Sequence, residues 1–165
     1  MEKELLESFY ALRTVSWRRA FLTNPSLQAQ VHQQISADLA TDLANTVREV
    51  AEALHPEQSI KLSADQRQVE LSDRRGSITT CFINTSNVGS VHLQFASRDG
   101  SEVTDTLRLD CVGEKTYVWM SGGVQIPPND LAKYLLHKLA QHAASVLQRE
   151  TRTASQAVVG ISRII

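Results

Sequence analysis

The chain has 165 residues, of which 42% are hydrophobic and 21% are charged, so it is long enough and apolar enough to bury a core. Its 17 Lys and Arg residues and 18 Asp and Glu residues give a formal net charge of -1. Proteins that bind nucleic acids usually carry a surplus of basic residues, so this balance argues against nucleic acid as the main partner.

The expected location follows from the hydrophobic runs, the first residues and the cysteines. No run approaches the ~20 apolar residues that are needed to span a bilayer. Residues 1–4 (MEKE) are acidic where a secretory leader would be basic. The two cysteines, Cys81 and Cys111, are too few for a disulfide framework. We therefore expect a cytoplasmic protein that has no membrane partner.

The first 55 residues contain no glycine, and their apolar residues recur at helical spacing in two segments. Asn24 and Pro25 separate the segments, as a capping residue followed by proline at the first helical position. Proline disfavours helix in the residue before it, so Pro56 should end a second helix about 45 Å long. The apolar stripe of the first segment is Leu5, Leu6, Phe9 and Leu12, and that of the second is Leu27, Val31, Ile35, Leu39, Leu43, Val47, Val50 and Leu54.

The second predicted helix is longer than the average helix of a globular protein. One small sheet would not easily cover an apolar stripe of that length, so part of it should pack against a second chain. We therefore predict a homodimer whose interface uses the helix between Pro25 and Leu54.

After Pro56 the hydrophobic period changes from that of a helix to that of a strand. Four glycines, Gly76, Gly89, Gly100 and Gly113, separate the apolar runs at intervals that suit an antiparallel meander. All four prolines lie outside these runs, as expected for paired strands. The pattern predicts an antiparallel sheet of about six strands over residues 59–120. The strand-like runs are 60–62, 69–71, 77–83, 91–95, 103–112 and 115–120.

The C-terminal part is predicted to begin with a helix over residues 129–149, which Asn129 or Asp130 caps. A polar stretch follows, and residues 157–165 are then too apolar for an ordinary solvated tail, so we expect them to dock, a strand being one option. The order of elements predicts one α+β domain over residues 1–165. Its parts would be helices in 1–55, the sheet in 59–120, a helix in 129–149 and a docked tail in 150–165.

The apolar C-terminal segment gives a testable prediction. Val158, Val159, Ile161 and Ile164 should be at least partly buried, against an edge strand or a second subunit. Since each buried Val or Ile contributes ~1.5–3 kcal/mol, deletion of residues 157–165 should lower the melting temperature or the solubility. An unchanged melting temperature and oligomeric state would show that the segment does not contribute.

The residues around Gly113 predict a strand register. Val112-Gly113-Glu114-Lys115 fits a two-residue hairpin with glycine at the first turn position, as a type II′ turn requires. Paired residues share a face, so one face of this hairpin is apolar and belongs to the core. The core-side pairs are Cys111 with Thr116, Leu109 with Val118 and Leu107 with Met120, and the opposite pairs are Asp110 with Tyr117 and Arg108 with Trp119.

The preceding hairpin turns at Asp99 and Gly100. A three-residue loop with Gly100 in the left-handed conformation keeps Leu93 and Phe95 on the same face as Leu107. The opposite face then becomes the best candidate for a binding site, because aromatic and charged side chains would share it. Its predicted members are His92, Gln94, Arg108, Asp110, Tyr117 and Trp119. The alternative is a sheet face that is covered by helices, or solvated, and that only carries favourable cross-strand pairs.

Catalytic and metal-binding interpretations have weaker support. Cys81 with His92 and Asp110 would need an activated thiol, but Cys81 lies in an apolar, strand-like run. No two of the five histidines have ligand spacing, so no metal is predicted. Residues 120–123 follow a strand and contain two glycines, but the lysine of a phosphate-binding loop is missing. We expect neither a metal nor another cofactor.

These observations favour a non-catalytic protein-interaction domain, of the adaptor or chaperone type, that acts as a small dimer and binds another protein. In size, mild acidity and α+β character the chain is similar to bacterial secretion chaperones, which is an analogy of fold. The alternative is a small-ligand-binding domain or an enzyme. Its pocket would lie between the sheet and the helices and use His92, Arg108 and Asp110.

Overall fold

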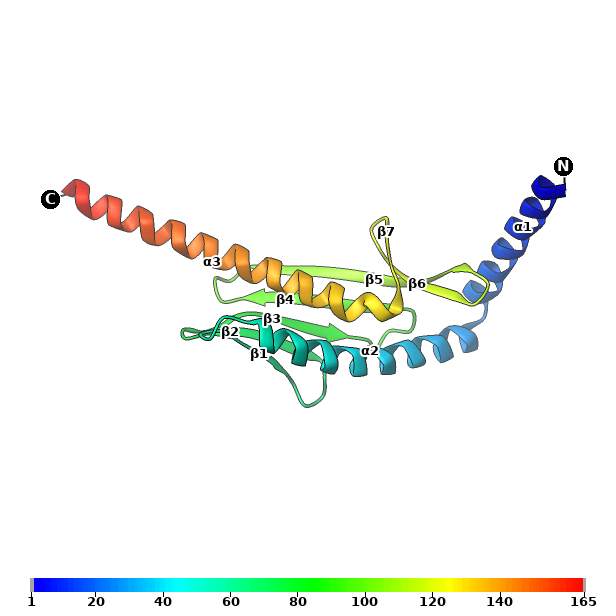
Figure 1. Cartoon of the computed structure of the whole chain (residues 1–165), viewed down its shortest axis with the longest axis horizontal. Coiled ribbons are helices and arrows are strands. Elements are labelled where there is room, and N and C mark those ends of the chain that lie inside the picture. The colour runs from blue at the N-terminus through cyan, green and yellow to red at the C-terminus, as the bar shows by residue number, and fades with distance from the viewer. Residues whose placement is uncertain (1, 165) are drawn as a thin grey trace.

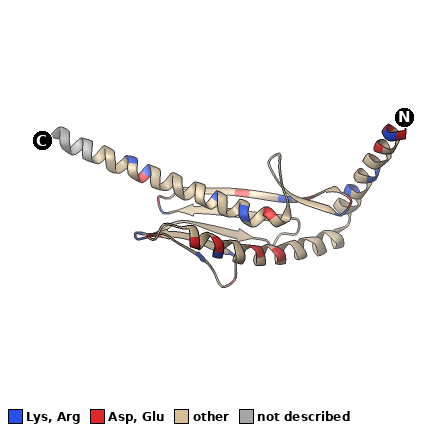
Figure 2. Ribbon diagram, viewed as in Figure 1, with Lys and Arg blue, Asp and Glu red and all other residues tan. Residues whose placement is uncertain are grey.

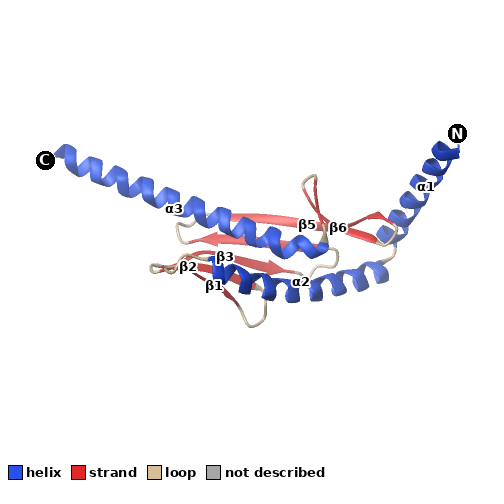
Figure 3. Ribbon diagram, viewed as in Figure 1, coloured by secondary structure: helices blue, strands red, loops and turns tan. Residues whose placement is uncertain are grey.

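The computed structural model describes residues 2–164, and describes side chains over residues 2–157. Two N-terminal helices, α1 (Glu2–Thr23) and α2 (Pro25–Ala53), precede an antiparallel sheet, and a long helix, α3 (Leu131–Ile164), follows it (Figures 1 and 3). The remaining elements are β1 (Ser59–Leu62), β2 (Gln68–Asp73), β3 (Gly76–Asn84), β4 (Ser90–Ser97), β5 (Glu102–Gly113), β6 (Thr116–Ser121), β7 (Val124–Ile126) and the 3-10 turn η1 (Pro128–Asp130).

The sheet is a meander of seven strands in which each strand pairs antiparallel with the next. This confirms the predicted α+β fold with an antiparallel meander sheet, with seven strands where about six were expected. The additional strand is β7. It has three residues between Gly123 and Pro127, too few for an alternating pattern to be visible in the sequence.

One face of the sheet is covered by α2 and α3, which lie side by side across it (Figure 1). Alternate residues of the central strands point into this layer, which is the reason for the period of two in the sequence. The buried apolar side chains include Ile35, Leu39, Leu43 and Val47 of α2, Val69, Cys81, Leu93, Phe95 and Leu107 of the strands, and Leu131, Leu135, Leu139 and Val146 of α3.

The α2 helix begins as the sequence predicts. The Asn24 side-chain oxygen accepts a hydrogen bond from the backbone N–H of Leu27 at 3.1 Å, and Pro25 occupies the first turn. The chain's own sheet and α3 bury the central part of the α2 stripe, from Ile35 to Val47. Little of the apolar stripe of α2 therefore remains for a second chain to cover. The length of the stripe no longer favours a dimer interface on α2.

The first helix is largely uncovered. Only its C-terminal part packs against the rest of the chain, where Phe21 is 2% exposed, and its N-terminal part extends away from the sheet (Figure 1). The exposed apolar side chains of α1 are Leu5, Leu6, Phe9, Tyr10, Leu12, Val15 and Leu22, which are 50% to 68% exposed.

Up to Ile164, the last described residue, the C-terminal segment continues α3 as helix and does not form a strand. The side chains of residues 151–157 are exposed, and α3 extends past the edge of the sheet (Figure 1). The side chains of Val158, Val159, Ile161 and Ile164 lie outside the described residues, so their expected burial stays a prediction.

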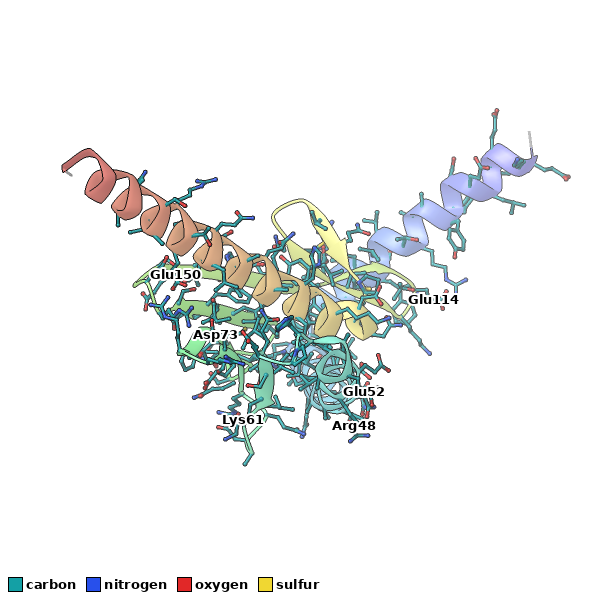
Figure 4. The ribbon with its side chains drawn as sticks, turned by 60° about the vertical axis from the view of Figure 1, so that its left-hand side comes forward. Arg48, Glu52, Lys61, Asp73, Glu114 and Glu150 are labelled. Atoms are coloured by element: carbon teal, nitrogen blue, oxygen red, sulfur yellow. The ribbon has the colours of Figure 1, made fainter. Side chains whose placement is uncertain are left out.

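An ion-pair cluster holds α3 to the end of the sheet. Arg98, in the β4–β5 loop, donates to Asp73 of β2 at 2.7 and 3.0 Å and to Glu150 of α3 at 2.7 and 2.8 Å. Figure 4 labels Asp73 and Glu150 on the same side of the molecule. Hydrogen bonds from the Arg98 guanidinium hold the pKa of both carboxyl groups below their ordinary values. The ionised carboxylates therefore stabilise the docked position of α3.

This cluster predicts a pH dependence of stability. A carboxyl whose pKa is lowered by folding contributes stability above its unfolded pKa, and the contribution is lost as pH falls through the folded pKa. Arg98→Met should therefore lower the melting temperature clearly at about pH 7 and much less at about pH 3. Arg74→Met is the control, because Arg74 pairs with Glu57 at an exposed position and such pairs contribute little. Equal losses at both pH values for Arg98→Met would contradict the role of the cluster.

Candidate functional site

The β5–β6 hairpin has a different register from the predicted one. Leu109 pairs with Trp119, and Cys111 pairs with Tyr117. Val112 is an unpaired extra residue in β5, a β-bulge, and it moves the two-residue turn one position along the chain to Glu114 and Lys115. The predicted turn at Gly113 and Glu114 is therefore wrong. Because side chains alternate, this one-residue shift moves every residue of β6 to the other face of the sheet.

Tyr117 and Trp119 consequently lie on the helix-covered face, and their predicted place beside Arg108 and Asp110 is wrong. Trp119 is 0% exposed, and the His32 ring of α2 lies edge-on to it at 6.0 Å. The Tyr117 ring packs 5.1 Å from that of Phe21. Burial of the large indole beneath α2 removes apolar area from water, which favours the bulged register, although the indole nitrogen of Trp119 is buried without a hydrogen-bond partner among the described residues.

The β4–β5 hairpin has the predicted three-residue loop. Gly100 has φ 86°, and the backbone N–H of Ser97 donates to the carbonyl of Ser101 at 2.9 Å. His92 therefore lies opposite Thr106, on the face that points away from α2 and α3. We call this side of the sheet the outer face. Among the described side chains it carries Gln68, Glu70, Thr80, Phe82, Asn84, His92, Gln94, Thr104, Thr106, Arg108, Asp110, Val118 and Met120.

Three of the six predicted site residues are accessible on the outer face. The His92 ring nitrogen Nδ1 lies 3.1 Å from the Thr106 hydroxyl, which fixes the orientation of the imidazole. Gln94 makes a long contact, 3.4 Å, with Glu102. Arg108 is exposed and makes no ion pair with any residue that the structure describes. These three side chains offer donors and acceptors to a partner.

Asp110, the fourth predicted residue on this face, is already engaged. Arg18 of α1 donates to both of its carboxylate oxygens, at 3.0 and 2.9 Å. A second pair, Arg13 with Glu114, anchors α1 near the hairpin turn. Asp110 therefore positions α1. The sequence analysis assigned Asp110 to binding because its partner, Arg18, lies 92 residues away in the chain and leaves no local signal.

The outer face also has an apolar component that the sequence analysis did not identify. Phe82 is 38% exposed beside Gln94 of the neighbouring strand, and Met120 lies beside Arg108. The alternation of β3, with Cys81 and Ile83 buried, could have indicated that Phe82 points outward. The face is therefore mixed in character, with apolar, polar and charged groups on adjacent strands.

The catalytic triad considered from the sequence is absent. Cys81 is 0% exposed on the helix-covered face, whereas His92 and Asp110 lie on the outer face. Burial raises the pKa of the Cys81 thiol to about 12, so it is protonated at neutral pH and is not a nucleophile. Among the described residues, no group of three or more His, Cys, Asp or Glu side chains is placed to hold a metal ion.

A groove of about 650 Å³ lies on the other side of the sheet, between α2, the β5–β6 turn and η1. Its polar lining includes Asp38 and Asp42, one turn apart on α2, and Lys115 of the turn. We call it the α2 groove. Since His92, Arg108 and Asp110 lie on the outer face, the pocket predicted for them between sheet and helices is not formed.

A half-buried polar cluster lies beside α3. The Tyr134 hydroxyl of α3 and the Ser121 hydroxyl of β6 both donate to Asp105 of β5, at 2.5 and 2.9 Å. Burial, and the bond to Asp105, raise the pKa of the Tyr134 phenol, so it remains a hydrogen-bond donor. This arrangement fixes the start of α3 on the sheet and does not supply an ionised group for chemistry.

Comparison with known proteins adds no relative. No family model matches the chain, and neither the curated proteins nor the solved structures contain a match. Within the described residues, no helix is long and apolar enough to cross a membrane. The fold and the site define an α+β protein in which α2 and α3 cover one sheet face, and the opposite face is open except where α1 meets Asp110.

The observed register predicts different effects for substitutions of Trp119 and Arg108, which the sequence analysis had placed on the same face. Trp119→Ala should lower the free energy of unfolding by ~3–5 kcal/mol, because it leaves a large cavity beneath α2. Arg108→Ala should change it by no more than ~0.5 kcal/mol, because the side chain is exposed. Urea unfolding of both variants measures the difference. Similar small effects for the two substitutions would contradict the buried position of Trp119.

Proposed function

We propose that this protein is a non-catalytic protein-interaction domain, of the adaptor or chaperone type, that acts as a small homodimer and binds another protein on its outer face. The observation that carries the proposal is the position of α2 and α3. Both cover the same face of the sheet, and most of the opposite face is left to solvent (Figure 1).

The composition of the outer face suits a protein partner. Protein interfaces combine apolar side chains, which supply contact area, with polar groups that set orientation, and arginine is enriched in them. Phe82 and Met120 supply the apolar part, and Arg108, His92 and Gln94 supply hydrogen-bonding groups around it. We propose the cytoplasm as its location, since both cysteines are free thiols and a reducing compartment keeps them so.

Ligand binding in the α2 groove is the second candidate. The observation that favours it is the size of the groove, about 650 Å³, which lies within the range of ~300–1,000 Å³ for small-molecule sites. Its polar lining, with Asp38, Asp42 and Lys115, is less suited to a drug-like molecule than to a small polar one. The groove is open, so it would enclose such a ligand incompletely.

The test of the outer face compares matched substitutions. A partner is first captured with the wild-type chain, and its affinity for purified variants is then measured by calorimetry. Arg108→Glu and Phe82→Glu should each weaken binding by tenfold or more, as substitutions at the centre of an interface do. Lys133→Glu, on the exposed side of α3, is the control and should bind normally.

The competing outcomes are distinct. If Arg108→Glu and Phe82→Glu fold and bind as the wild type does, the outer face is not the binding surface. If Asp38→Ala and Lys115→Ala weaken binding in their place, the protein partner occupies the α2 groove and the outer face is not its binding surface.

A further inference from the structure

The exposed surface of α1 has a regular pattern. Thr14 and Trp17 are half-buried and Phe21 is buried, so these three residues, spaced three and four apart, form a row that points toward the rest of the chain. A second row lies about 140° away around the helix, by the rotation of 100° per residue. It consists of Glu2, Leu5, Phe9, Leu12, Ser16 and Arg19. We call it the free seam of α1.

The free seam has the spacing of a coiled-coil interface. Its residues follow each other at alternate intervals of three and four, which keeps them on one side of a helix that packs against another helix. At its centre, Leu5, Phe9 and Leu12 are 57%, 62% and 60% exposed. Leu6, Tyr10 and Val15 are also exposed, elsewhere on the helix, but the three seam residues follow one another on a single side, and grouped exposed apolar side chains indicate an interaction site.

The N-terminal part of α1 also lacks support from its own chain. Its contacts with the remainder of the protein are made mainly by the C-terminal part, through Phe21, Arg18 and Arg13. A helical segment that is shorter than about 12–15 residues is marginal in water unless its apolar face is packed. Packing of the seam against a partner would therefore stabilise this segment as helix.

The charges on the helix identify the partner. The first half of α1 carries Glu2, Lys3, Glu4 and Glu7, so this end of the helix is acidic (Figure 2). The second half is basic, but Arg13 and Arg18 already pair with Glu114 and Asp110, which leaves Arg19 as its basic group for a partner. Within the described part of the chain, neither Glu2 nor Arg19 makes an ion pair. A helix with this pattern complements a second copy of itself in the antiparallel direction.

We propose that α1 pairs along its free seam with α1 of a second copy, antiparallel, and so forms the homodimer. If the pairing is centred between Phe9 and Leu12, these two residues contact each other across the twofold axis, and Leu5 lies against Ser16 of the other copy. Glu2 then lies beside Arg19 of the other copy at each end. A parallel pair would place like charges together, and a twofold axis requires that both contacts occur twice.

The inference rests on the dimeric part of the proposed function and is independent of the outer face. The expected dimer interface is then on α1 and not on α2, because the chain's own sheet and α3 bury the centre of the α2 stripe. Partner binding by a monomeric chain would therefore contradict the inference and leave the outer face intact as a binding surface.

Sedimentation equilibrium of the full chain tests the apolar part of the interface. The wild type should sediment at twice its 18.3 kDa mass at micromolar concentration. Phe9→Glu should sediment as a monomer, since it places two carboxylates at the centre of the pair. Val124→Glu is the control, because Val124 is equally exposed, at 60%, but lies on β7. A monomeric wild type, or a Phe9→Glu variant that remains a dimer, would overturn the inference.

A charge exchange tests the orientation. Glu2→Arg and Arg19→Glu should each weaken the dimer by about tenfold, because each repels a like charge at both ends of the pair. The double variant, with the two charges exchanged, should regain the wild-type dissociation constant. Failure of the double variant to recover would overturn the antiparallel arrangement. Circular dichroism of each variant establishes that the fold is retained.

Discussion

The burial of one face of the meander beneath α2 and α3 is the constraint on which the other features depend. Side chains alternate along a strand, so fixing Val91, Leu93 and Phe95 in the core also fixes His92 and Gln94 on the outer face. The same constraint acts on β6, where the bulge at Val112 allows Trp119 to enter the core. The outer face is thus composed of the residues that the core does not use.

The helices α1 and α3 are each held to the sheet by ion pairs near the point where they leave it. The Arg98 cluster fixes α3 at the end of the sheet from which the helix extends, and Arg18 and Arg13 fix the C-terminal part of α1 on the β5–β6 hairpin. Beyond these anchors both helices leave the sheet (Figure 1). The surface available to partners is therefore divided in two: the outer face of the sheet, and the free seam of α1.

The function proposed for the protein uses both surfaces for different purposes. Pairing of two α1 helices would place two sheets in one particle, each with its outer face accessible to a partner. A dimer of this kind binds a partner that has two contact points more tightly than a monomer does, through a raised effective concentration. Dimerisation through α1 and recognition through the sheet can thus be separated by substitutions at Phe9 and Arg108.

The sequence by itself determined the order of elements, the helix start at Asn24, the meander and the outward position of His92, Gln94 and Arg108, because these follow from local periodicity, capping and turn chemistry. It did not determine the faces of Tyr117 and Trp119. A single unpaired residue moves every following side chain of the hairpin to the opposite face of the sheet. Whether Val112 forms such a bulge depends on how much apolar area α2 can cover. The engagement of Asp110 by Arg18, across 92 residues, was likewise decided only by the tertiary structure, because no local pattern records which distant helix will pass a given strand.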